Sequence, residues 1–543
     1  ETCISRMQEF HEKNPLLFKP ELEEISNKYR SNIQYFIFKS IILRNLYGVD
    51  IMVEATEIAK LRLFLKMVAV VEVDMRADNL GLDPLPDIDF NIRCGNTLVG
   101  YATEAELQED LEYGDIFARQ EFEDKVNTQM QIVATAFNRF KEVQFRQSED
   151  MAAFKKAKGE LTKRLAILNE LLNKHMHTTI ATGYNYEAWL KSHQPFHWLA
   201  EFYEIIHDNG GFDVIIGNPP YVEYNTVKNY SIRDFLTINC GNLFGFCIER
   251  SFELLKKSGK FGFIVPISIT CSKRMKEVQN MLLNKGTYFS NWSWRPSKLF
   301  DGNKSANLSL SIIMTTGFKQ NYVSTYNRWN SEARAYIFKK VIYTKCPYKI
   351  SHIIPKIGSN IENSIYDKIL SFDTLSSKIL KNSQYKMYYK RTGGLYWKIF
   401  TDFRPKLWIN GKQTYSSKEE DLSFATSKDR DVALCLLWSD YYWWWYQINS
   451  DVRNNNPSDL ISFRCNYISF ESKKFSSLKN ELEEDLINNS VWSERRFGGN
   501  VSRYKSFIPK LSKNIINSID KELNVYYGFT DEELDFIINY AIK

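Results

Sequence analysis

The stretch that decides the fold is Gly211-Phe212-Asp213-Val214-Ile215-Ile216-Gly217-Asn218-Pro219-Pro220-Tyr221. Its apolar run, 212–216, predicts a short buried strand that ends at Gly217. In open α/β sheets, ligands bind at the carboxyl ends of the strands. Two successive prolines fix φ and remove two backbone donors, so the loop behind this strand is stiff.

The loop places hydrogen-bond acceptors beside an aromatic ring. Asn218 has a side-chain carbonyl, Pro219 has a free backbone carbonyl, and Tyr221 has a flat face. This arrangement suits one task, which is gripping the exocyclic amine of a planar heterocycle. Taken alone, the same residues also allow an ordinary strand-to-loop transition with a Pro-Pro stop.

Length and composition limit the class of protein. The 543 residues, 44% of them hydrophobic, predict about two or three globular domains. No apolar run approaches the roughly 18–20 residues that span a bilayer, and the N-terminus lacks a secretory signal, so we expect no membrane partner. The eight cysteines form no CxxC pair. This favours reduced thiols in a cytoplasmic protein without a metal site.

Positive charge is concentrated in one part of the chain. The net charge is +6, yet residues 301–400 alone contain 16 Lys and Arg against 5 Asp and Glu. A basic block interleaved with Tyr and Trp is typical of a surface that binds a polyanion. A solvated basic face is the alternative.

An earlier strand and helix precede the deciding stretch. The run 54–73 has apolar residues at helical spacing, including Ile58, Leu61 and Leu65, and it follows a strand that we expect to end at Asp50. A carboxylate at a strand tip can accept hydrogen bonds from both ribose hydroxyls of a nucleoside cofactor. An aspartate there can also simply cap the helix.

Two long amphipathic helices are predicted between Phe117 and His177. Apolar residues recur every three or four positions in 122–140 and again in 154–172, with a polar break between the two series. This pattern predicts an antiparallel helical hairpin whose apolar stripe packs between the two helices. A stripe that faces DNA or a partner is the alternative.

The α/β rhythm returns after the hairpin. We expect a helix from Asn242 to Lys257, a strand over 261–266, and two further strands over 292–300 and 308–314. Beyond about residue 320 the regular alternation of predicted helices and strands ends. The six aromatic residues 441–446 are expected not to face a single core, so that some face another surface. Guanidinium groups lie beside flexible glycines in 495–504.

The order of these motifs resembles the gamma class of N6-adenine DNA methyltransferases, and within it the type IIG restriction–modification proteins. The motifs are Asp50, Asn96, Asn218–Tyr221, 242–249, Pro266 and Phe300. The resemblance implies a Rossmann-like, doubly wound methyltransferase sheet in residues 1–320, with the hairpin 117–177 as an insertion. It also implies a mixed α+β target-recognition domain in residues 321–543.

The resemblance further implies S-adenosylmethionine as cofactor, a flipped adenine as substrate, and specific site residues. Cofactor contacts fall on Asp50, Ile51, Asn96, Thr97 and Phe246, the last because Cys247 stands where relatives have an aromatic residue. Catalysis falls on Asn218, Pro219, Pro220 and Tyr221. DNA contacts fall on Phe300, Lys298, Lys304, Arg495, Arg496 and Arg503.

One departure from the family pattern is important. No Gly-rich turn of the kind that lies under the methionine part of the cofactor precedes Asp50. We therefore expect a family member cut downstream of that turn, with a nuclease region farther upstream in the parent protein. Double-stranded DNA is the expected partner of a monomer. The alternatives are a non-catalytic DNA-recognition fragment, a protein-glutamine methyltransferase and an RNA methyltransferase.

Overall fold

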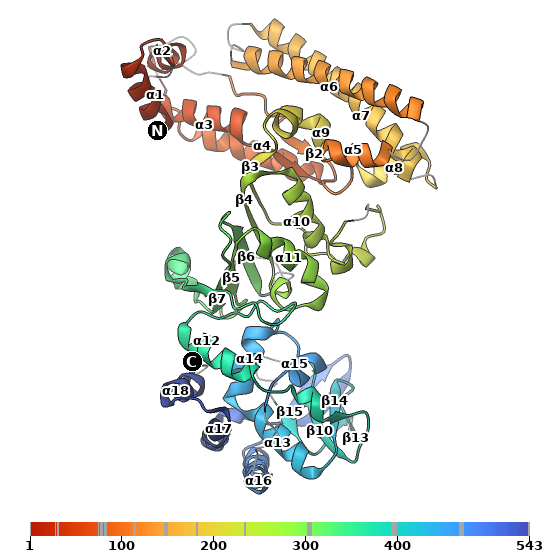
Figure 1. Ribbon diagram of the computed structural model, residues 1–543, viewed down its shortest axis with the longest axis vertical. Helices are drawn as coiled ribbons and strands as arrows, with labels where there is room; N and C mark the ends of the chain where they lie inside the picture. The colour runs from red at the N-terminus through yellow and green to blue at the C-terminus, as the bar shows by residue number, and fades with distance from the viewer. Residues whose placement is uncertain are drawn as a thin grey trace. The chain divides into compact units, whose positions relative to one another are not determined.

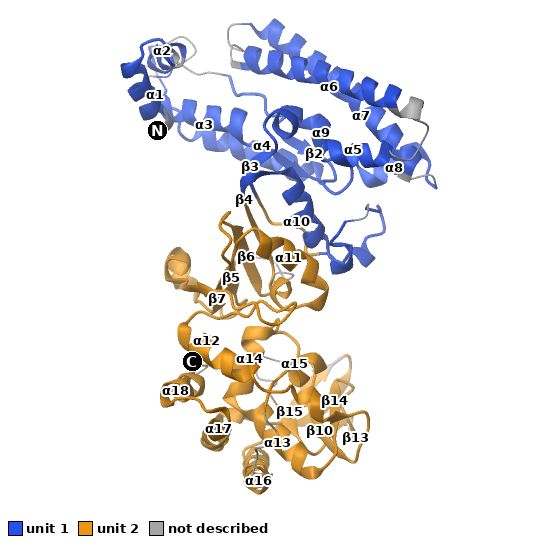
Figure 2. Cartoon of the chain, in the orientation of Figure 1, with its two compact units in different colours: residues 1–215, 222–259 blue, residues 216–221, 260–543 orange. Residues whose placement is uncertain are grey.

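Helices and β-sheets, one of them mixed, build the chain, which is described by a computed structural model (Figure 1). The description covers residues 2–27, 29, 32–73, 75–76, 80, 84–111, 116–145, 150–180, 183–232, 235–300, 307–392, 399–465 and 472–540. The chain divides into two compact units (Figure 2): unit 1 is residues 1–215 and 222–259, and unit 2 is residues 216–221 and 260–543. No helix in the described ranges is long and apolar enough to cross a membrane.

Unit 1 begins with helices and a small parallel sheet. Its first elements are α1 (Thr2–Lys13), α2 (Lys19–Asn27), α3 (Ile33–Asn45), β1 (Gly48–Asp50), α4 (Val53–Val68) and β2 (Ile92–Cys94). β1 pairs with β2 in parallel, with Asp50 opposite Cys94. The strand predicted to end at Asp50 and the helix behind it are both present. The helix ends at Val68, before the predicted Val73.

The predicted helical hairpin is present as α6 (Ile116–Phe145) and α7 (Met151–Ile180), which lie side by side (Figure 1). Its apolar stripe is buried between the two helices and against α8 (Tyr186–His193) and α9 (Trp198–Glu201), so it is packing surface. The buried residues include Val126, Met130, Val133, Leu161, Leu165, Leu168 and Leu172. The short helix α5 (Glu104–Leu111) adds Leu107 to this core.

The predicted strand of the deciding stretch is present as β3 (Phe212–Gly217), which runs from unit 1 into unit 2. The prediction that this strand is buried was wrong, because Val214 and Ile216 are 58% and 80% exposed. It lies at one edge of a six-stranded sheet with the order β3-β4-β6-β5-β7-β8. The other members are β4 (Leu255–Pro266), β5 (Thr287–Trp292), β6 (Leu310–Thr315), β7 (Tyr322–Asn327) and β8 (Tyr343–Lys345). β5 is parallel to β7 and antiparallel to β6, so this sheet is mixed.

Two predicted element boundaries were wrong, one at the end of the helix before β4 and one at a strand of this sheet. The helix α10 (Leu243–Leu254) ends before the predicted Lys257, because the chain becomes extended at Leu255 and pairs as β4 with β3. The Lys256 Nζ lies 2.7 Å from the Asp213 carboxylate across this pair. Residues 293–300 form no strand, and β5 lies before them instead. β7 and β8 continue the sheet beyond residue 320, so the predicted domain boundary falls between two strands of one sheet.

The rest of unit 2 combines helices with two four-stranded sheets. The sheet β11-β10-β14-β9 contains β9 (Ile379–Leu380), β10 (Tyr385–Lys390), β11 (Phe400–Thr401) and β14 (Glu419–Phe424). The sheet β13-β12-β16-β15 contains β12 (Leu407–Ile409), β13 (Lys412–Thr414), β15 (Val491–Phe497) and β16 (Asn500–Ser506). The helices of unit 2 are α11 (Lys276–Asn284), α12 (Asn360–Leu370), α13 (Ser427–Trp438), α14 (Asp440–Asn449), α15 (Pro457–Ile461), α16 (Ser472–Asn488), α17 (Lys513–Tyr527) and α18 (Asp531–Asn539).

The expectation that the aromatic run 441–446 would face more than one surface was wrong. Five of its six side chains, all except Trp443, are at most 1% exposed. They share one core because α14 is surrounded by α13, α15, α17, α18 and β7. A helix that is apolar all round is a buried helix. Four of the buried side chains are hydrogen-bonded at their polar atoms, as when the Tyr446 hydroxyl donates to the Asn454 carbonyl oxygen at 2.8 Å, whereas the Trp445 Nε1 has no partner among the described residues.

Mixed α/β architecture is therefore confirmed. The described strands of the first 320 residues form two separate sheets, β1-β2 and the six-stranded sheet. The doubly wound arrangement and the target-recognition role of residues 321–543 stay predictions.

Candidate active site

The loop behind β3 is held by the hydroxyl group of Tyr221. This hydroxyl lies 2.6 Å from the Asn218 Oδ1 and 2.9 Å from the Ile264 carbonyl oxygen, and it can donate to either. Burial raises the pKa of Tyr221, so the hydroxyl stays protonated and remains a donor. Pro219 is buried, whereas Asn218 is exposed. The loop therefore presents an amide carbonyl to solvent from a fixed position.

The Tyr221 hydroxyl has one proton and two acceptors within reach, so it does not depend on the Asn218 carbonyl. A phenol donates one hydrogen bond. If another donor approaches the Asn218 Oδ1, the Tyr221 hydroxyl still has the Ile264 carbonyl as acceptor. The loop can therefore bind an amine without leaving this half-buried hydroxyl unsatisfied, which would cost up to about 1–3 kcal/mol.

In unit 1, the carboxyl ends of β1 and β2 bring the predicted cofactor residues together. The backbone N–H of Gly95 donates to the Asp50 carbonyl oxygen at 2.9 Å, which joins the two loops that follow the strands. The Asp50 Oδ1 accepts from the backbone N–H of Met52, and the side chain is exposed. Asp50 and Ile51 thus lie beside the loop of Asn96 and Thr97, as the motif order predicts.

Asn96 is 3% exposed, and its Oδ1 accepts from the backbone N–H of Leu98 at 3.1 Å. Its Nδ2, which carries two N–H donors, is buried and makes no hydrogen bond of normal geometry to the described residues. The Tyr230 hydroxyl is a candidate weak acceptor, because an interaction with the Asn96 side chain opposes the rise that burial causes in the pKa of Tyr230. A buried, unsatisfied amide donor is costly, so the position suits a ligand that supplies an acceptor.

Phe246 lies in the core of unit 1. It is fully buried in α10, with its ring 5.6 Å from the Tyr224 ring and 5.7 Å from the Phe235 ring. The Phe235 and Phe246 planes are stacked at 19°. The ring supports the chain at 222–241, and contact with a cofactor stays a prediction.

An ion cluster in α10 was missed at the sequence level. The Arg250 guanidinium is 2% exposed, and it lies 2.7 Å from the Glu106 carboxylate and 2.8 Å from the Glu253 carboxylate. Glu106 also accepts from the backbone N–H of Ala102, and therefore connects α10 to the segment behind Asn96. The available signal was a pair of charges, Glu249-Arg250, inside an otherwise apolar helix.

This cluster predicts a pH dependence of stability. Burial raises the pKa of Glu253 to about 7, and the Arg250 charge opposes only part of that rise. The folded state holds this proton more tightly than the unfolded state, so its stabilisation is present below about pH 4.5 and is lost as pH rises through about 7. We expect Glu253→Gln to be more stable than the wild type at pH 8, by about 1–2 kcal/mol after allowance for solvent screening. The difference should shrink toward pH 5.

Urea unfolding at pH 5, 6, 7 and 8 checks this expectation. Glu160→Gln is the matched control, because Glu160 is an exposed glutamate in the i,i+4 pair with Arg164. A Glu253→Gln advantage that is equal at all four values would contradict the proton-linked explanation.

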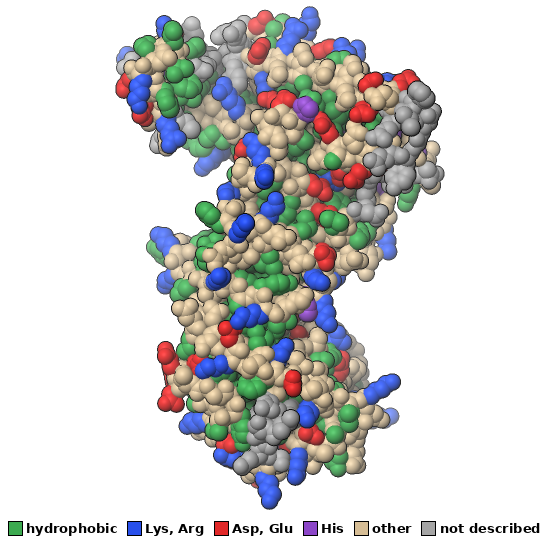
Figure 3. All heavy atoms as spheres, viewed as in Figure 1, with side chains coloured by type: hydrophobic (Ala, Val, Ile, Leu, Met, Phe, Trp, Pro, Cys, Tyr) green, Lys and Arg blue, Asp and Glu red, His purple; other side chains and the backbone are tan. Residues whose placement is uncertain are grey.

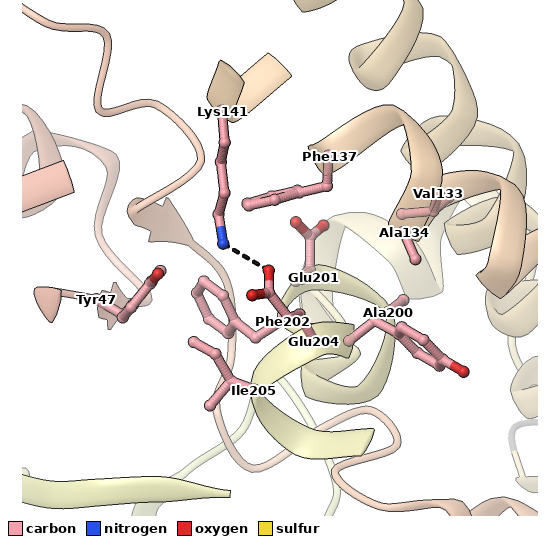
Figure 4. A pocket seen from close by; sticks show the side chains of 11 residues that line it. Tyr47, Val133, Ala134, Phe137, Lys141, Ala200, Glu201, Phe202, Glu204 and Ile205 are labelled. Atoms are coloured by element: carbon pink, nitrogen blue, oxygen red, sulfur yellow. Dashed lines mark hydrogen bonds and ion pairs between the residues drawn. The ribbon is translucent and has the colours of Figure 1, made fainter. Parts of the chain in front are cut away.

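Unit 1 also contains a small cavity (Figure 4). It measures about 20 Å³ and is lined by Tyr47, by residues of α6 and by the segment 200–205. Among the lining side chains, the Lys141 Nζ lies 2.5 Å from the Glu204 carboxylate. A volume of this size holds about one water molecule, so no nucleoside cofactor fits.

The predicted DNA contacts lie at two places in unit 2. The Arg334 guanidinium donates to the Leu299 carbonyl oxygen at 3.0 Å and so fixes the loop of Lys298 and Phe300, which are both half-buried. Lys304 lies outside the described residues. Arg495, Arg496 and Arg503 are exposed on β15 and β16. On the face drawn in Figure 3, Lys and Arg side chains are spread over unit 2 and do not gather in one patch.

The site residues divide between the two units. Asp50, Ile51, Asn96, Thr97 and Phe246 belong to unit 1, and Asn218–Tyr221 belong to unit 2.

Comparison with known proteins gives a family match and several relatives. Residues 44–300 match the model of the Eco57I restriction-modification methylase family. The type II restriction enzyme and methyltransferase RM.MjaORFECS2P of Methanocaldococcus jannaschii is 30% identical over 302 residues, which cover 45% of this chain and 24% of that protein. The type II methyltransferase M.HincII of Haemophilus influenzae is 26% identical over 190 residues, covering 34% of this chain and 36% of that protein.

A further relative is named as an RNA enzyme. The tRNA1(Val) (adenine(37)-N6)-methyltransferase of a Flavobacteriaceae bacterium is 31% identical over 121 residues, covering 21% of this chain and 51% of that protein. The chain therefore spans about a quarter to a half of the length of these relatives. Among solved structures, the type IIL restriction-modification enzyme MmeI in complex with DNA is similar at 10% identity and a TM-score of 0.35, over 81% of this chain and 77% of that chain.

Proposed function

Because residues 44–300 belong to the Eco57I restriction-modification methylase family, we propose that this chain methylates DNA as the modification part of a restriction–modification enzyme. The reaction is transfer of a methyl group from S-adenosylmethionine to the N6 amine of an adenine rotated out of the duplex. The observation that carries the proposal is the position of the Tyr221 hydroxyl, 2.6 Å from the Asn218 Oδ1 and 2.9 Å from the Ile264 carbonyl oxygen, which keeps the Asn218 acceptor beside an aromatic ring.

In the proposed reaction, the loop binds and orients the amine. The Asn218 Oδ1 and the Pro219 carbonyl accept the two N6 hydrogens, while the Tyr221 ring stacks on the base. Both hydrogen bonds draw the nitrogen lone pair out of conjugation with the ring. The nitrogen attacks the methyl carbon, the carbon–sulfur bond breaks, and the methylated amine releases a proton to solvent. Positioning supplies most of the acceleration, so no strong base is needed.

The residues of unit 1 fit the cofactor. S-adenosylmethionine supplies a methyl group bound to a positively charged sulfur. The exposed Asp50 carboxylate has acceptors for the ribose hydroxyls, and the unsatisfied Asn96 Nδ2 has a donor for an adenine ring nitrogen. Ile51 is 38% exposed beside Asp50 and offers an apolar contact. Thr97 and Phe246 complete the proposed pocket.

Unit 2 is proposed to hold the duplex. Lys298, Lys304, Arg495, Arg496 and Arg503 would neutralise phosphates, and Phe300 would flank the space of the rotated adenine. Base rotation costs a few kcal/mol. Phosphate contacts make the affinity for DNA fall as the salt concentration rises. The salt dependence of DNA binding therefore tests this part of the proposal.

The direct test is calorimetric titration with S-adenosylmethionine, followed by transfer of labelled methyl to duplex DNA. We expect 1:1 cofactor binding and N6-methyladenine in the hydrolysed product. DNA binding without cofactor binding would instead identify a recognition fragment. Methylation of a protein glutamine would overturn the choice of substrate.

An RNA methyltransferase is a second candidate, favoured by the identity with the Flavobacteriaceae tRNA enzyme over 121 residues. Equal amounts of duplex DNA and transfer RNA in one reaction decide between the two. We expect the label in DNA, and label in RNA alone would reverse the assignment.

The two functions of Tyr221 can be separated by substitution. Tyr221→Phe keeps the ring and removes the bonds to Asn218 and Ile264, so we expect kcat/KM to fall about tenfold. Tyr221→Ala also removes the stacking surface and should cost about 100-fold or more. Steady-state kinetics on duplex DNA measures both. If Tyr221→Phe loses as much as Tyr221→Ala, the hydroxyl and not the ring is what the reaction needs.

A further inference from the structure

The sheet β13-β12-β16-β15 is built from two hairpins whose turns are fixed to each other. Asn410 and Gly411 turn one hairpin with φ of 49° and 82°, and Gly498 and Gly499 turn the other with φ of 55° and 79°. Two residues with positive φ are typical of the type I′ turn. The Asn410 Nδ2 donates to the Asn500 Oδ1 at 2.8 Å, so the two turns support each other.

One face of this sheet carries exposed tryptophan and basic side chains. Because side chains alternate along a strand, the register places on one face Trp408, Trp492, Glu494, Arg496, Arg503 and Lys505. We call this the tryptophan face. Trp492 is 48% exposed, and the charged members are exposed. The opposite face carries the half-buried residues Ser493, Ser502, Tyr504 and Ser506 together with the exposed residues Ile409, Val491 and Arg495. Both faces therefore reach solvent, and the tryptophan face is the one that carries the indoles.

Cations surround the exposed indole. The Arg503 guanidinium lies 4.5 Å from the Trp492 ring centroid, and the Lys505 Nζ lies 6.0 Å from it. The centroid of the Trp408 ring lies 5.3 Å from the centroid of the Trp492 ring, and the two ring planes meet at 67°. Cation–π contact and the neighbouring strands hold Trp492 in one orientation before any partner binds. The solvent face of an antiparallel sheet is normally polar, so an indole kept there in this way indicates a binding surface.

The charge around the face is one-sided. Residues 404–418 contain four basic and no acidic side chains, and residues 491–510 contain five basic and one acidic. The complementary partner is therefore a polyanion with aromatic groups. Nucleic acid bases meet that description, and stacking on an indole requires bases whose faces are free. In a duplex these faces are covered by neighbouring pairs.

We propose that the tryptophan face binds single-stranded DNA, with an unpaired base stacked on Trp492 and with Arg496, Arg503 and Lys505 on the phosphates. This goes beyond methyl transfer and needs none of the proposed catalytic or cofactor residues, although Arg496 and Arg503 are shared with the proposed duplex contacts. The choice of DNA over RNA rests on the proposed function. The physical consequence is that this face prefers unpaired over paired DNA.

The test is fluorescence anisotropy with a labelled 12-nucleotide oligothymidine, the duplex of the same length, and oligouridine, each at two salt concentrations. We expect the single strand of DNA to bind more tightly than the duplex. Trp492→Ala should weaken single-strand binding about 5- to 150-fold, from about 1–3 kcal/mol per stacked base. Trp492→Phe should restore most of the affinity. Arg503→Gln should weaken it without removing the indole.

Lys412→Ala is the matched control, because Lys412 is an exposed cation of the same sheet that lies opposite Ile409, so its side chain projects from the opposite face. It should change single-strand affinity by less than about threefold. The proposal is overturned if Trp492→Ala binds like the wild type, if Lys412→Ala costs as much as Trp492→Ala, or if oligouridine binds best. Methylation of duplex DNA tests the proposed function separately, so either can fail alone.

Discussion

Replacing Asn218 by alanine is expected to lower methyl transfer roughly 100- to 1000-fold, the range found when one preorganised hydrogen-bonding group is removed from an active site. The amine would lose the acceptor that fixes its lone pair, while the Tyr221 hydroxyl would keep the Ile264 carbonyl as its acceptor. The loop should therefore stay in place. DNA affinity, measured by anisotropy, should change by less than about twofold because Asn218 is not among the phosphate contacts.

Asn229→Ala is the control for this experiment. Asn229 is an exposed asparagine eleven positions farther along the chain, outside the proposed contacts. Its activity should match the wild type. If Asn218→Ala loses DNA binding and activity together, the loop has a folding role, and the catalytic assignment of Asn218 falls.

Replacing Gly100 by alanine is expected to destabilise unit 1 by about 3 kcal/mol or more. Gly100 has φ of +123°, a conformation that L side chains rarely adopt, and a Cβ there would lie 2.2 Å from the Phe196 carbonyl oxygen. Neither group can move easily, because the Phe196 N–H donates to the Val99 carbonyl oxygen at 2.7 Å. The loop of Asn96 would be displaced, so cofactor affinity should fall with stability. Urea unfolding and calorimetry measure the two effects.

A glycine-to-alanine substitution at Gly159 should instead raise stability. Gly159 lies inside α7 with open space around its Cα, and alanine there should stabilise the helix by about 0.5–1 kcal/mol. If both variants destabilised equally, the backbone at Gly100 would not explain its effect. A Gly100→Ala protein of wild-type stability would contradict the geometry of the 95–100 loop.

The elements with strong local signals were predictable from the sequence. The apolar run 212–216 gives β3, the stiff loop follows it, and the helical periodicities give α4, α6 and α7. These signals depend on neighbours within a few residues. Asp50 and Asn96 lie on neighbouring loops because the parallel strands β1 and β2 end at one sheet edge, whereas the sequence grouped the two residues only through the family resemblance.

Features set by distant contacts were not predictable. The early end of α10 follows from pairing between β3 and β4, and Lys256 gives no sign of this in the sequence. The burial of the 441–446 aromatics depends on five elements that are separated along the chain. The bond from Tyr221 to the Ile264 carbonyl joins residues 43 positions apart. In each case tertiary structure overrides local pattern.

The position of β3 at a sheet edge has a consequence for handling the protein. Val214 and Ile216 are 58% and 80% exposed on it. An uncovered apolar edge strand is a template for pairing with another molecule. Concentrated samples should therefore be prone to intermolecular β-aggregation that begins at the strand carrying the Asn-Pro-Pro-Tyr loop. Loss of activity on storage would then result from aggregation at this edge, and dilute samples would keep their activity longest.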